Sequence, residues 1–348
     1  EERVLMEKFS EFIIEAKEKP YRLVVLSHDD PLDPNETGVL IREKASKIGI
    51  DCLLVEMTGF FINEEEGKLF VNSFPVDDKG GVEEPSPKKE SKYVKPYEIR
   101  KDDTIIMVRG QGTPGLTGNH SWMDIVKDLE YRGFTVINSS RCHDICSDKF
   151  MNQIYFDRHK IRTPKTVRIA HIEDSDNALK KLESNFPIIL KTTIGSRGIG
   201  VILVESAPSL GSIVQLLYCE NEFIDILLQE QIKSSYDVRV IVCNGEVIAS
   251  IKRPVVKGDF RSNVSQGSEP VSFDLTDLER SESIRAAKVV EGIFVGVDFI
   301  AAKDREKESP YFIEVNSTPG LIGIEKVGFS VTERVLEKLK SLKLSNKS

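Results

Sequence analysis

The sequence predicts a protein of mixed α/β and α+β class, in which a parallel α/β unit precedes two α+β lobes. Three observations predict this fold class. The chain has 348 residues, enough for two or three domains with sizeable cores. From residue 22 a strand, a helix and a second strand follow one another, an order typical of a parallel sheet. From Pro187 onward, short strand patterns dominate and helices interleave with them.

The first third of the chain is expected to form the parallel unit. Apolar positions at helical spacing predict a leading amphipathic helix over 3–19. Residues 77–98 are rich in proline, glycine and charge, so we expect an exposed excursion, because such a composition cannot fill a core. The other elements expected here are strands over 22–27, 51–57, 104–108 and 134–137 and helices over 39–48 and 121–132.

The rest of the chain has a different pattern. Ser147 is expected to cap the start of a helix. Strands over 188–191 and 200–205 flank the glycine-rich loop GSRGIG. Further helices are expected near 208–218, 277–291 and 325–342. We therefore expect three domains, namely 1–146 with the 77–98 excursion, a middle lobe over 147–232 with the glycine-rich loop, and a C-terminal lobe over 233–348.

Composition and charge restrict the class of protein. Hydrophobic residues make up 40% and charged residues 30% of the chain, which is typical of a soluble globular protein. The net charge of −8 argues against a nucleic-acid partner. No apolar run approaches the ~18 residues of a membrane span, and the acidic N-terminus does not resemble a secretory signal. Five scattered cysteines indicate reduced thiols. We expect a cytoplasmic protein with no membrane partner.

A pair of facing carboxylates is the most specific chemical signal. Strand patterns over 296–300 and 312–316 predict a hairpin centred near Glu306. That centre sets Asp298 directly opposite Glu314, and the period of two puts Asn316 on the same face as Glu314. Facing carboxylates repel each other, and a bridging cation removes this cost. Two carboxylates and an amide oxygen suit Mg²⁺. The alternative is an exposed polar face on which the acids coincide.

The glycine-rich loop is the second signal. Lys191 ends a strand just before it, and three glycines follow within six residues, which lets backbone N–H groups turn toward an anion. The spacing fits neither the dinucleotide fingerprint nor the P-loop. A plain hairpin turn remains the alternative. The loop residues that we expect to bind a nucleotide are Gly195, Ser196, Gly198 and Gly200.

A basic segment over 252–263 is the third signal. It carries four cations, which either form a solvated loop or bind phosphoryl oxygens. In the second case Arg253 and Arg261 are the residues expected to hold the phosphoryl group, because a planar guanidinium pairs well with phosphate. If a substrate is an acidic amino acid, Lys252, Arg253 and Lys257 are the cations expected to bind its carboxylates.

Together these motifs resemble the ATP-grasp superfamily and, within it, the RimK-type ligases that add glutamate to a ribosomal-protein C-terminus. The resemblance runs from about Ser147 to Glu325. It is carried by SDK at 147–149, the strand ending at Lys191, GSRGIGV, QEQIK at 229–233, DVR at 237–239, GDFRSN, GVD at 296–298, EVN with STPG, and GIEK at 323–326.

The resemblance implies roles for individual residues. Lys149 and Lys191 would contact phosphates, and the Glu230–Gln231 stretch would hold adenine by backbone hydrogen bonds. Asp237 would lie at the nucleotide. Arg261 and Asn263, with Arg253, would bind phosphate or an acyl-phosphate in a catalytic role. Asp298, Glu314 and Asn316 would hold the metal ions, two Mg²⁺ with Mn²⁺ as a substitute.

The resemblance also implies an activity, that of an ATP-dependent, ADP-forming ligase that joins a carboxylate to an amine. The amine donor would be an amino acid such as glutamate, and the acceptor a peptide or protein C-terminus. A ligase that makes a small-molecule amide or short peptide is the first alternative, and a non-catalytic nucleotide-binding scaffold is the second. A homo-oligomer is expected.

Overall fold

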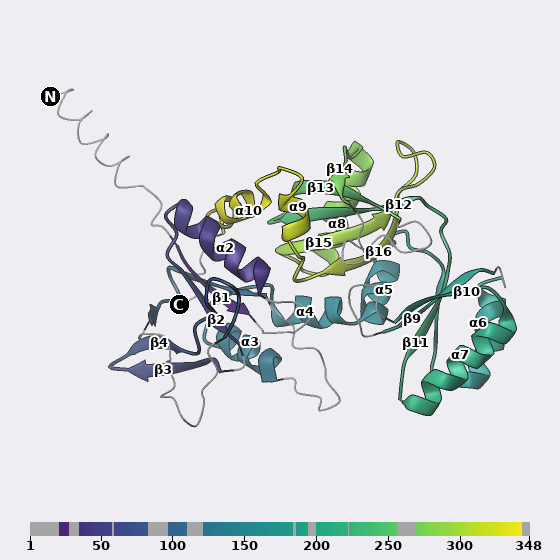
Figure 1. Cartoon of the computed structure of the whole chain (residues 1–348), viewed down its shortest axis with the longest axis horizontal. Coiled ribbons are helices and arrows are strands. Elements are labelled where there is room, and N and C mark those ends of the chain that lie inside the picture. The colour runs from purple at the N-terminus through teal and green to yellow at the C-terminus, as the bar shows by residue number, and fades with distance from the viewer. Residues whose placement is uncertain are drawn as a thin grey trace. The chain divides into compact units, whose positions relative to one another are not determined.

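The computed structural model describes residues 21–27, 35–57, 59–82, 97–109, 121–183, 186–193, 200–221, 223–255 and 269–342. The chain divides into two compact units, which we describe separately (Figure 1). Unit 1 comprises residues 1–137 and 332–348, and unit 2 comprises residues 138–331. The predicted helix over 3–19 and most of the 77–98 excursion lie outside the described residues. The three-domain division remains a prediction.

Unit 1 is built on a four-stranded parallel sheet, as predicted. Its order is β2-β1-β6-β7, and every neighbouring pair is parallel. β1 and β6 are buried along almost their whole length, which explains their unbroken apolar sequences. The elements are β1 (Arg22–Ser27), α2 (Glu36–Lys47), β2 (Cys52–Glu56), β6 (Thr104–Val108), α3 (Ser121–Tyr131), β7 (Thr135–Ile137) and most of α10 (Val331–Leu339).

A second, antiparallel sheet in unit 1 was not predicted. It joins β3 (Phe61–Glu65), β4 (Lys68–Asn72) and β5 (Tyr97–Ile99). Four of the five residues of β3 are exposed, so its sequence lacks the apolar alternation that identifies a strand. The available signal was the Glu66-Gly67 pair, whose φ values of 52° and 76° form the tight turn of a hairpin.

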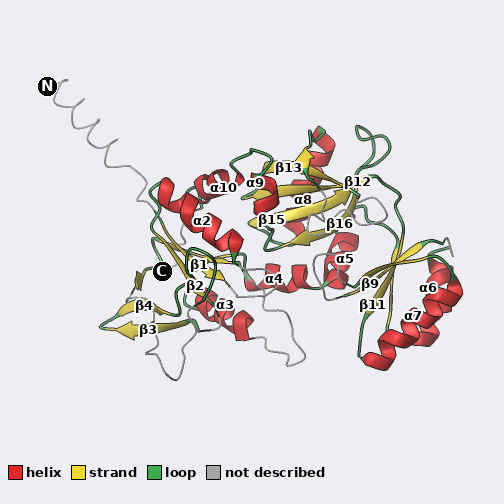
Figure 2. Cartoon of the chain, in the orientation of Figure 1, coloured by secondary structure: helices red, strands yellow, loops and turns green. Residues whose placement is uncertain are grey.

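Unit 2 contains a four-stranded antiparallel sheet of order β10-β9-β11-β8. The predicted strands on either side of the glycine-rich loop are confirmed as β9 and β10. Helices α6 and α7 pack against this sheet (Figure 2). The elements are β8 (Thr166–Ile169), α6 (Ser175–Lys181), β9 (Ile188–Thr192), β10 (Val201–Val204), α7 (Ala207–Glu220) and β11 (Ile226–Glu230), with a 3₁₀ turn at Ile172–Asp174.

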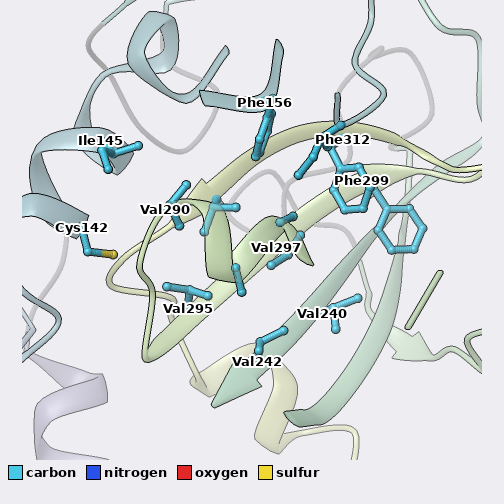
Figure 3. Packing of buried hydrophobic residues seen from close by; sticks show 14 of the residues in the cluster. Cys142, Ile145, Phe156, Val240, Val242, Val290, Val295, Val297, Phe299 and Phe312 are labelled. Carbon is cyan, nitrogen blue, oxygen red and sulfur yellow. The ribbon is translucent and has the colours of Figure 1, made fainter. Parts of the chain in front are cut away.

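Unit 2 also contains a five-stranded antiparallel sheet of order β14-β13-β12-β15-β16. One face is apolar and is covered by helices, and its side chains interdigitate with theirs (Figure 3). The opposite face carries the charged Asp237, Arg239, Arg253, Asp298 and Glu314 together with the buried Ile241 and Ile251. We call it the polar face. The elements are α4 (Ser140–Ser147), α5 (Lys149–Arg158), β12 (Tyr236–Cys243), β13 (Glu246–Pro254), β14 (Val271–Ser272), α8 (Asp277–Val289), β15 (Phe294–Ile300), β16 (Tyr311–Asn316) and α9 (Ile322–Glu325).

One predicted helix start is wrong. Ser147 is the last residue of α4 and does not cap α5. Asp148 is the N-cap instead, and its Oδ1 accepts hydrogen bonds from the backbone N–H groups of Phe150 and Met151 at 2.6 and 3.2 Å. Aspartate and serine are about equally good caps, so the sequence allowed either residue.

All five cysteines are free thiols, as predicted. Cys142 and Cys146 both lie in α4, with their sulfur atoms 4.0 Å apart. Within the part of the chain that the structure describes, no helix has the length and apolar character needed to cross a bilayer.

Candidate functional site

The predicted pair of facing carboxylates is confirmed. Asp298 on β15 lies directly opposite Glu314 on β16. The side-chain amide of Asn316 donates to Glu314 Oε1 at 3.2 Å and approaches Asp298 Oδ2 at 3.5 Å. The two carboxylates and the Asn316 amide therefore lie together on one face of the five-stranded sheet, with the amide nitrogen of Asn316 toward the carboxylates. The metal site remains a prediction.

A β-bulge sets this arrangement and shifts the predicted hairpin register. Beyond Asp298 the pairing moves by one residue, so that Phe299 faces Phe312 and Ile313 is the extra residue. The backbone N–H of Phe312 turns away and donates to the carbonyl of Arg162 at 2.8 Å. Strict alternation along the strand from Glu314 would place Ile313 on the buried face. Phe312 takes that place, because the bulge reverses the alternation.

Two arginines that come from other strands surround Asp298. Arg239 on β12 donates two hydrogen bonds to its carboxylate, at 2.7 and 2.6 Å, and Arg253 on β13 approaches at 3.1 Å. Arg253 also donates to both oxygens of Asp237, at 2.6 and 2.7 Å. Burial by itself would raise the pKa of Asp298, but the two guanidinium groups outweigh it and hold the pKa below its ordinary value.

Arg253 itself is only 3% exposed. Burial would lower its pKa, but the carboxylates of Asp298 and Asp237 raise it well above the ordinary value, so the guanidinium stays charged. In the ligand-free protein Arg253 is thus occupied by carboxylates. Its predicted contact with phosphate would have to be made with the remaining N–H groups or after rearrangement.

Two lysines interact electrostatically with Glu314. Lys191, at the end of β9, donates to Gln229 Oε1 at 2.7 Å, and Gln229 in turn donates to Thr166 Oγ1 at 2.8 Å. Burial is the main cause that lowers the pKa of Lys191 to about 8. The charge of Lys149 lowers it further, and Glu314 partly offsets both.

The pKa of Lys149 is shifted for the same main reason as that of Lys191. Burial lowers its pKa, and the negative charges of Glu314 and Asp148 oppose the shift. The lysine is placed by the first turn of α5, where its backbone N–H donates to the carbonyl of Thr193 at 3.0 Å. Lys149 and Lys191 therefore both lie within electrostatic reach of Glu314, one of the three predicted metal ligands.

Only the last residue of the predicted phosphate loop is described. Gly200 has a φ of +76°, and its carbonyl accepts a hydrogen bond from the N–H of Thr192 at 3.0 Å. A Cβ atom at this position would clash with Thr192 Oγ1. Glycine is therefore required both by conformation and by space. Gly195, Ser196 and Gly198 lie outside the described residues.

The predicted adenine stretch is tied to the start of β8. The N–H of Glu230 donates to the carbonyl of Lys165 at 2.9 Å, and Glu230 Oε1 accepts from the N–H of Lys165 at 2.7 Å. The N–H of Glu230 is thus already occupied, so an adenine contact would fall to other backbone groups of this stretch, including those of Gln231.

The two described cations of the basic segment lie on opposite faces of the sheet. Lys252 pairs with Val238, whose side chain is in the apolar core, whereas Arg253 pairs with Asp237 on the polar face. Adjacent residues of a strand point to opposite faces, so Lys252 and Arg253 cannot serve the same ligand. Lys257, Arg261 and Asn263 lie outside the described residues.

Sequence reasoning missed two side chains of this site. Arg239 belongs to the DVR motif but was given no role, and Gln229 was not singled out as the partner of Lys191. The spacing of Arg239 from Asp237 indicated that Arg239 faces the site, because residues two apart on a strand share a face. The contact with Asp298 required knowledge that β12 lies between β13 and β15.

The donor set of this site fits a magnesium ion. In the described part of the chain, no group of three or more histidine, cysteine, aspartate or glutamate side chains could hold a metal. A cation here would therefore depend on Asp298, Glu314 and the amide oxygen of Asn316. Asp298 Oδ2 is approached by both Arg239 and Arg253, whereas Oδ1 accepts from Arg239 and so retains a second lone pair for a cation. Mg²⁺ usually takes one or two carboxylates and completes its shell with water and phosphate oxygens.

Comparison with solved structures identifies the fold. An ATP-grasp ligase associated with ribosomally made peptides from Chryseobacterium gregarium, solved with ADP and a leader and core peptide, aligns with a TM-score of 0.65 at 12% identity, over 94% of this chain and 99% of that one. The ATP-grasp ligase PsnB, solved with a minimal precursor, Mg and ADP, aligns with a TM-score of 0.60 at 15% identity, over 91% and 98%. The protein therefore has the ATP-grasp fold, as predicted.

Sequence comparison then identifies the family. The RimK-like ATP-grasp domain matches residues 146–339, which is more than half of the chain, and the protein belongs to this family. A probable alpha-L-glutamate ligase of Psychromonas ingrahamii is 35% identical over 203 residues, which are 58% of this chain. The match spans 65% of that relative, slightly under two thirds of its length.

Proposed function

We propose that the protein is an ATP- and Mg²⁺-dependent, ADP-forming ligase that joins a carboxylate to the amine of an amino acid through an acyl-phosphate. The observation that carries this proposal is the facing Asp298–Glu314 pair, whose Glu314 interacts electrostatically with two buried lysines, Lys149 and Lys191. Phosphoryl transfer requires little covalent chemistry from the protein, and it depends on cations held where charge develops. Here the two lysine amines are such cations, and the two carboxylates would hold a further cation, Mg²⁺.

The proposed reaction has two steps. A substrate carboxylate oxygen attacks the γ-phosphorus of ATP, the bond to the β-γ bridging oxygen breaks, and ADP leaves. The amine then attacks the acyl carbon, inorganic phosphate leaves, and the amine loses a proton as the amide forms. Neither step requires a covalent bond to a side chain of the protein.

The chain's own residues have distinct parts in these steps. Lys149 and Lys191 bind phosphate oxygens and balance the negative charge that moves from the γ-phosphate to ADP. Asp298, Glu314 and Asn316 would hold Mg²⁺, two ions in our proposal. The metal supplies charge neutralisation and orientation of the phosphates. Arg239 and Arg253 keep Asp298 ionised and fixed in orientation.

The substrates are proposed from the relatives. The curated relative is named a probable alpha-L-glutamate ligase, which supports glutamate as the amine donor. Two structural neighbours were solved with peptide substrates, which supports a peptide or protein acceptor. We therefore propose that the protein adds glutamate, or a similar amino acid, to the C-terminal carboxylate of a peptide or protein.

A panel assay tests this function. ADP and amide formation are measured with each amino acid, with and without peptides that end in a free carboxylate, and with Mg²⁺ or Mn²⁺. We expect steady-state ADP formation only when both a carboxylate and an amine are present, because without the amine the reaction stops at the acyl-phosphate. Peptides with an amidated C-terminus are the matched control. Equal activity with small carboxylic acids would favour a metabolite ligase, and nucleotide binding without any turnover would favour a scaffold.

A further inference from the structure

Strand β16 carries two of the three predicted metal ligands, Glu314 and Asn316, and it is the last strand of the five-stranded sheet. Alternate residues of such a strand turn their backbone N–H and C=O groups away from the neighbouring strand. Val315, which lies between the two ligands, is one of these residues and is buried. Buried backbone groups need partners, and here the partners decide how firmly the strand is held.

The side-chain amide of Asn152 provides these partners. The N–H of Val315 donates to Asn152 Oδ1 at 3.0 Å, and Asn152 Nδ2 donates to the carbonyl of Val315 at 3.4 Å. Asn152 Nδ2 also donates, at 3.0 Å, to the carbonyl of Ile145. Ile145 is in the last turn of α4, where carbonyls lack a partner within the helix. The amide of Asn152 therefore takes the place that the backbone of a further strand would have.

Asn152 also links the strand to one of the predicted phosphate lysines. It lies on α5 three residues after Lys149, so the two side chains are neighbours on the helix surface. Lys149 in turn interacts electrostatically with Glu314. Asn152 is only 2% exposed, a position at which an apolar side chain would pack without desolvation of an amide. The bonds to β16 explain why a polar residue stands there, because an apolar one would leave the groups of Val315 unsatisfied.

A second buried amide holds the strand on the other side of Asn316. Asn138 Nδ2 donates to the carbonyls of Ser317 and Phe294, both at 2.7 Å. Its Oδ1 accepts from the N–H groups of Ile293 and Phe294 at 2.8 and 3.0 Å. A side-chain amide has two donor and two acceptor positions, and all of them are used here. Because Ser317 follows Asn316 directly and Phe294 begins β15, Asn138 joins the two strands that carry the predicted ligands.

We propose that Asn152 and Asn138 are positioning residues, which hold Glu314 and Asn316 in the geometry that binds Mg²⁺. This inference rests on the metal site of the proposed function. Mg²⁺ demands near-ideal octahedral geometry with ligands at about 2.0–2.1 Å, so a small displacement of either ligand weakens binding. Groups that orient metal ligands without touching the metal typically contribute a factor of about 10–100 to metal affinity.

Mn²⁺ binding to the full chain in the presence of ADP, followed by electron paramagnetic resonance, tests the proposal. Asn152→Leu removes every bond of the amide to β16 and should weaken Mn²⁺ binding about 10–100-fold. Asn152→Ser and Asn138→Ser leave room for a water molecule that replaces part of the lost bonds. These two variants should fold even if Asn152→Leu does not, and they should weaken Mn²⁺ binding by a smaller factor.

Asn35→Leu is the matched control. Asn35 is another buried amide, and its Nδ2 donates to the carbonyl of Gly80 at 3.0 Å in unit 1, whereas both predicted ligands of β16 belong to unit 2. This variant should lower the melting temperature and leave Mn²⁺ binding unchanged. The backbone amide of Val315 should exchange its hydrogen faster in Asn152→Leu and at the wild-type rate in Asn35→Leu.

Competition of Mg²⁺ and Ca²⁺ with Mn²⁺ separates positioning from a general loss of structure. Ca²⁺ accepts about 6–8 oxygen ligands in flexible geometry, so displaced ligands should weaken Mg²⁺ binding more than Ca²⁺ binding. Equal weakening of both ions, or wild-type Mn²⁺ affinity in the folded variants of Asn152 and Asn138, would overturn the proposal. If Glu314→Gln still weakens Mn²⁺ binding, the metal site survives that outcome. If Glu314→Gln leaves Mn²⁺ binding unchanged, the metal assignment fails and the positioning role fails with it.

Discussion

Arg239 forms a two-bond ion pair with Asp298, with nitrogen–oxygen distances of 2.7 and 2.6 Å. The carboxylate that the sequence predicts as a metal ligand is therefore already held by a cation in the ligand-free protein. The facing pair of Asp298 and Glu314 was expected to be repulsive without metal. Arg239, together with Arg253, removes part of that repulsion. The metal would have to share Asp298 with these two guanidinium groups.

Arg239→Met should therefore destabilise the ligand-free protein. Breaking a buried ion pair by removing one partner costs about 3–5 kcal/mol, and we expect the lower end because Arg253 remains in contact with Asp298. Mg²⁺ should restore more stability to the variant than it adds to the wild type. Urea denaturation with EDTA and with Mg²⁺ measures both effects. Asp298→Asn in the Arg239→Met background is the control and should recover stability. If the stability losses from Arg239→Met and Asp298→Asn simply add in the double variant, the two residues are not energetically coupled.

Glu314→Gln should lower turnover by roughly 10² or more, the scale lost with a group that stabilises developing charge. The fold should survive, because glutamine has almost the same shape and the change removes a repelling charge opposite Asp298. Steady-state kinetics and thermal melting are the measurements, and Mn²⁺ binding followed by electron paramagnetic resonance should weaken in parallel. Near-normal ATP-dependent ligation by this variant would refute the metal assignment.

Nucleotide binding should take up a proton near pH 8. The pKa of Lys191 is lowered by burial to about 8 in the ligand-free protein, and bound phosphate should raise it again. Calorimetry in buffers of different ionisation enthalpy measures this uptake. Lys191→Met should abolish the uptake, and Lys338→Met, a substitution in unit 1, should not.

The same shift predicts how stability depends on pH. Between about pH 8 and the ordinary pKa of 10.5, the unfolded chain keeps the proton of Lys191 and the folded chain has lost it. Stability of the ligand-free protein should therefore rise with pH in this window, by at most ~1.4 kcal/mol per pH unit. Lys191→Met should remove this rise. A wild type and variant with parallel stability curves would show that Lys191 titrates normally.

Gly200→Ala should raise the KM for ATP and lower stability. Alanine at a φ of +76° costs about 1–2 kcal/mol, and its Cβ atom would also clash with Thr192 Oγ1. Gly49→Ala is a matched control, because Gly49 has a φ of +77° and no atom within 4 Å of an added Cβ. Thr192→Ala should rescue the part of the loss that comes from the clash. Equal losses at Gly200 and Gly49 would show that only the backbone conformation matters.

Much of this protein was determined by the sequence alone, wherever the relevant contacts are local. The parallel strands of unit 1 are continuous apolar runs because both faces of β1 and β6 are buried. The hairpin of β15 and β16 follows from two alternating segments around one turn. A turn centred near Glu306 predicted the pairing of Asp298 with Glu314. The bulge at Ile313 completes this pairing, because the register next to the turn differs from it by one residue.

The tertiary structure decided what surrounds that pair. Arg239 lies 59 residues before Asp298, and the two meet because β12 pairs with β15. No periodicity in the sequence specifies which strands become neighbours, so the ion pair could not be predicted. The bulge at Ile313 was decided in the same way, since the N–H of Phe312 bonds to Arg162 from another part of the chain. The sequence alone determined which side chains share a face, and the order of the strands decided which charges meet there.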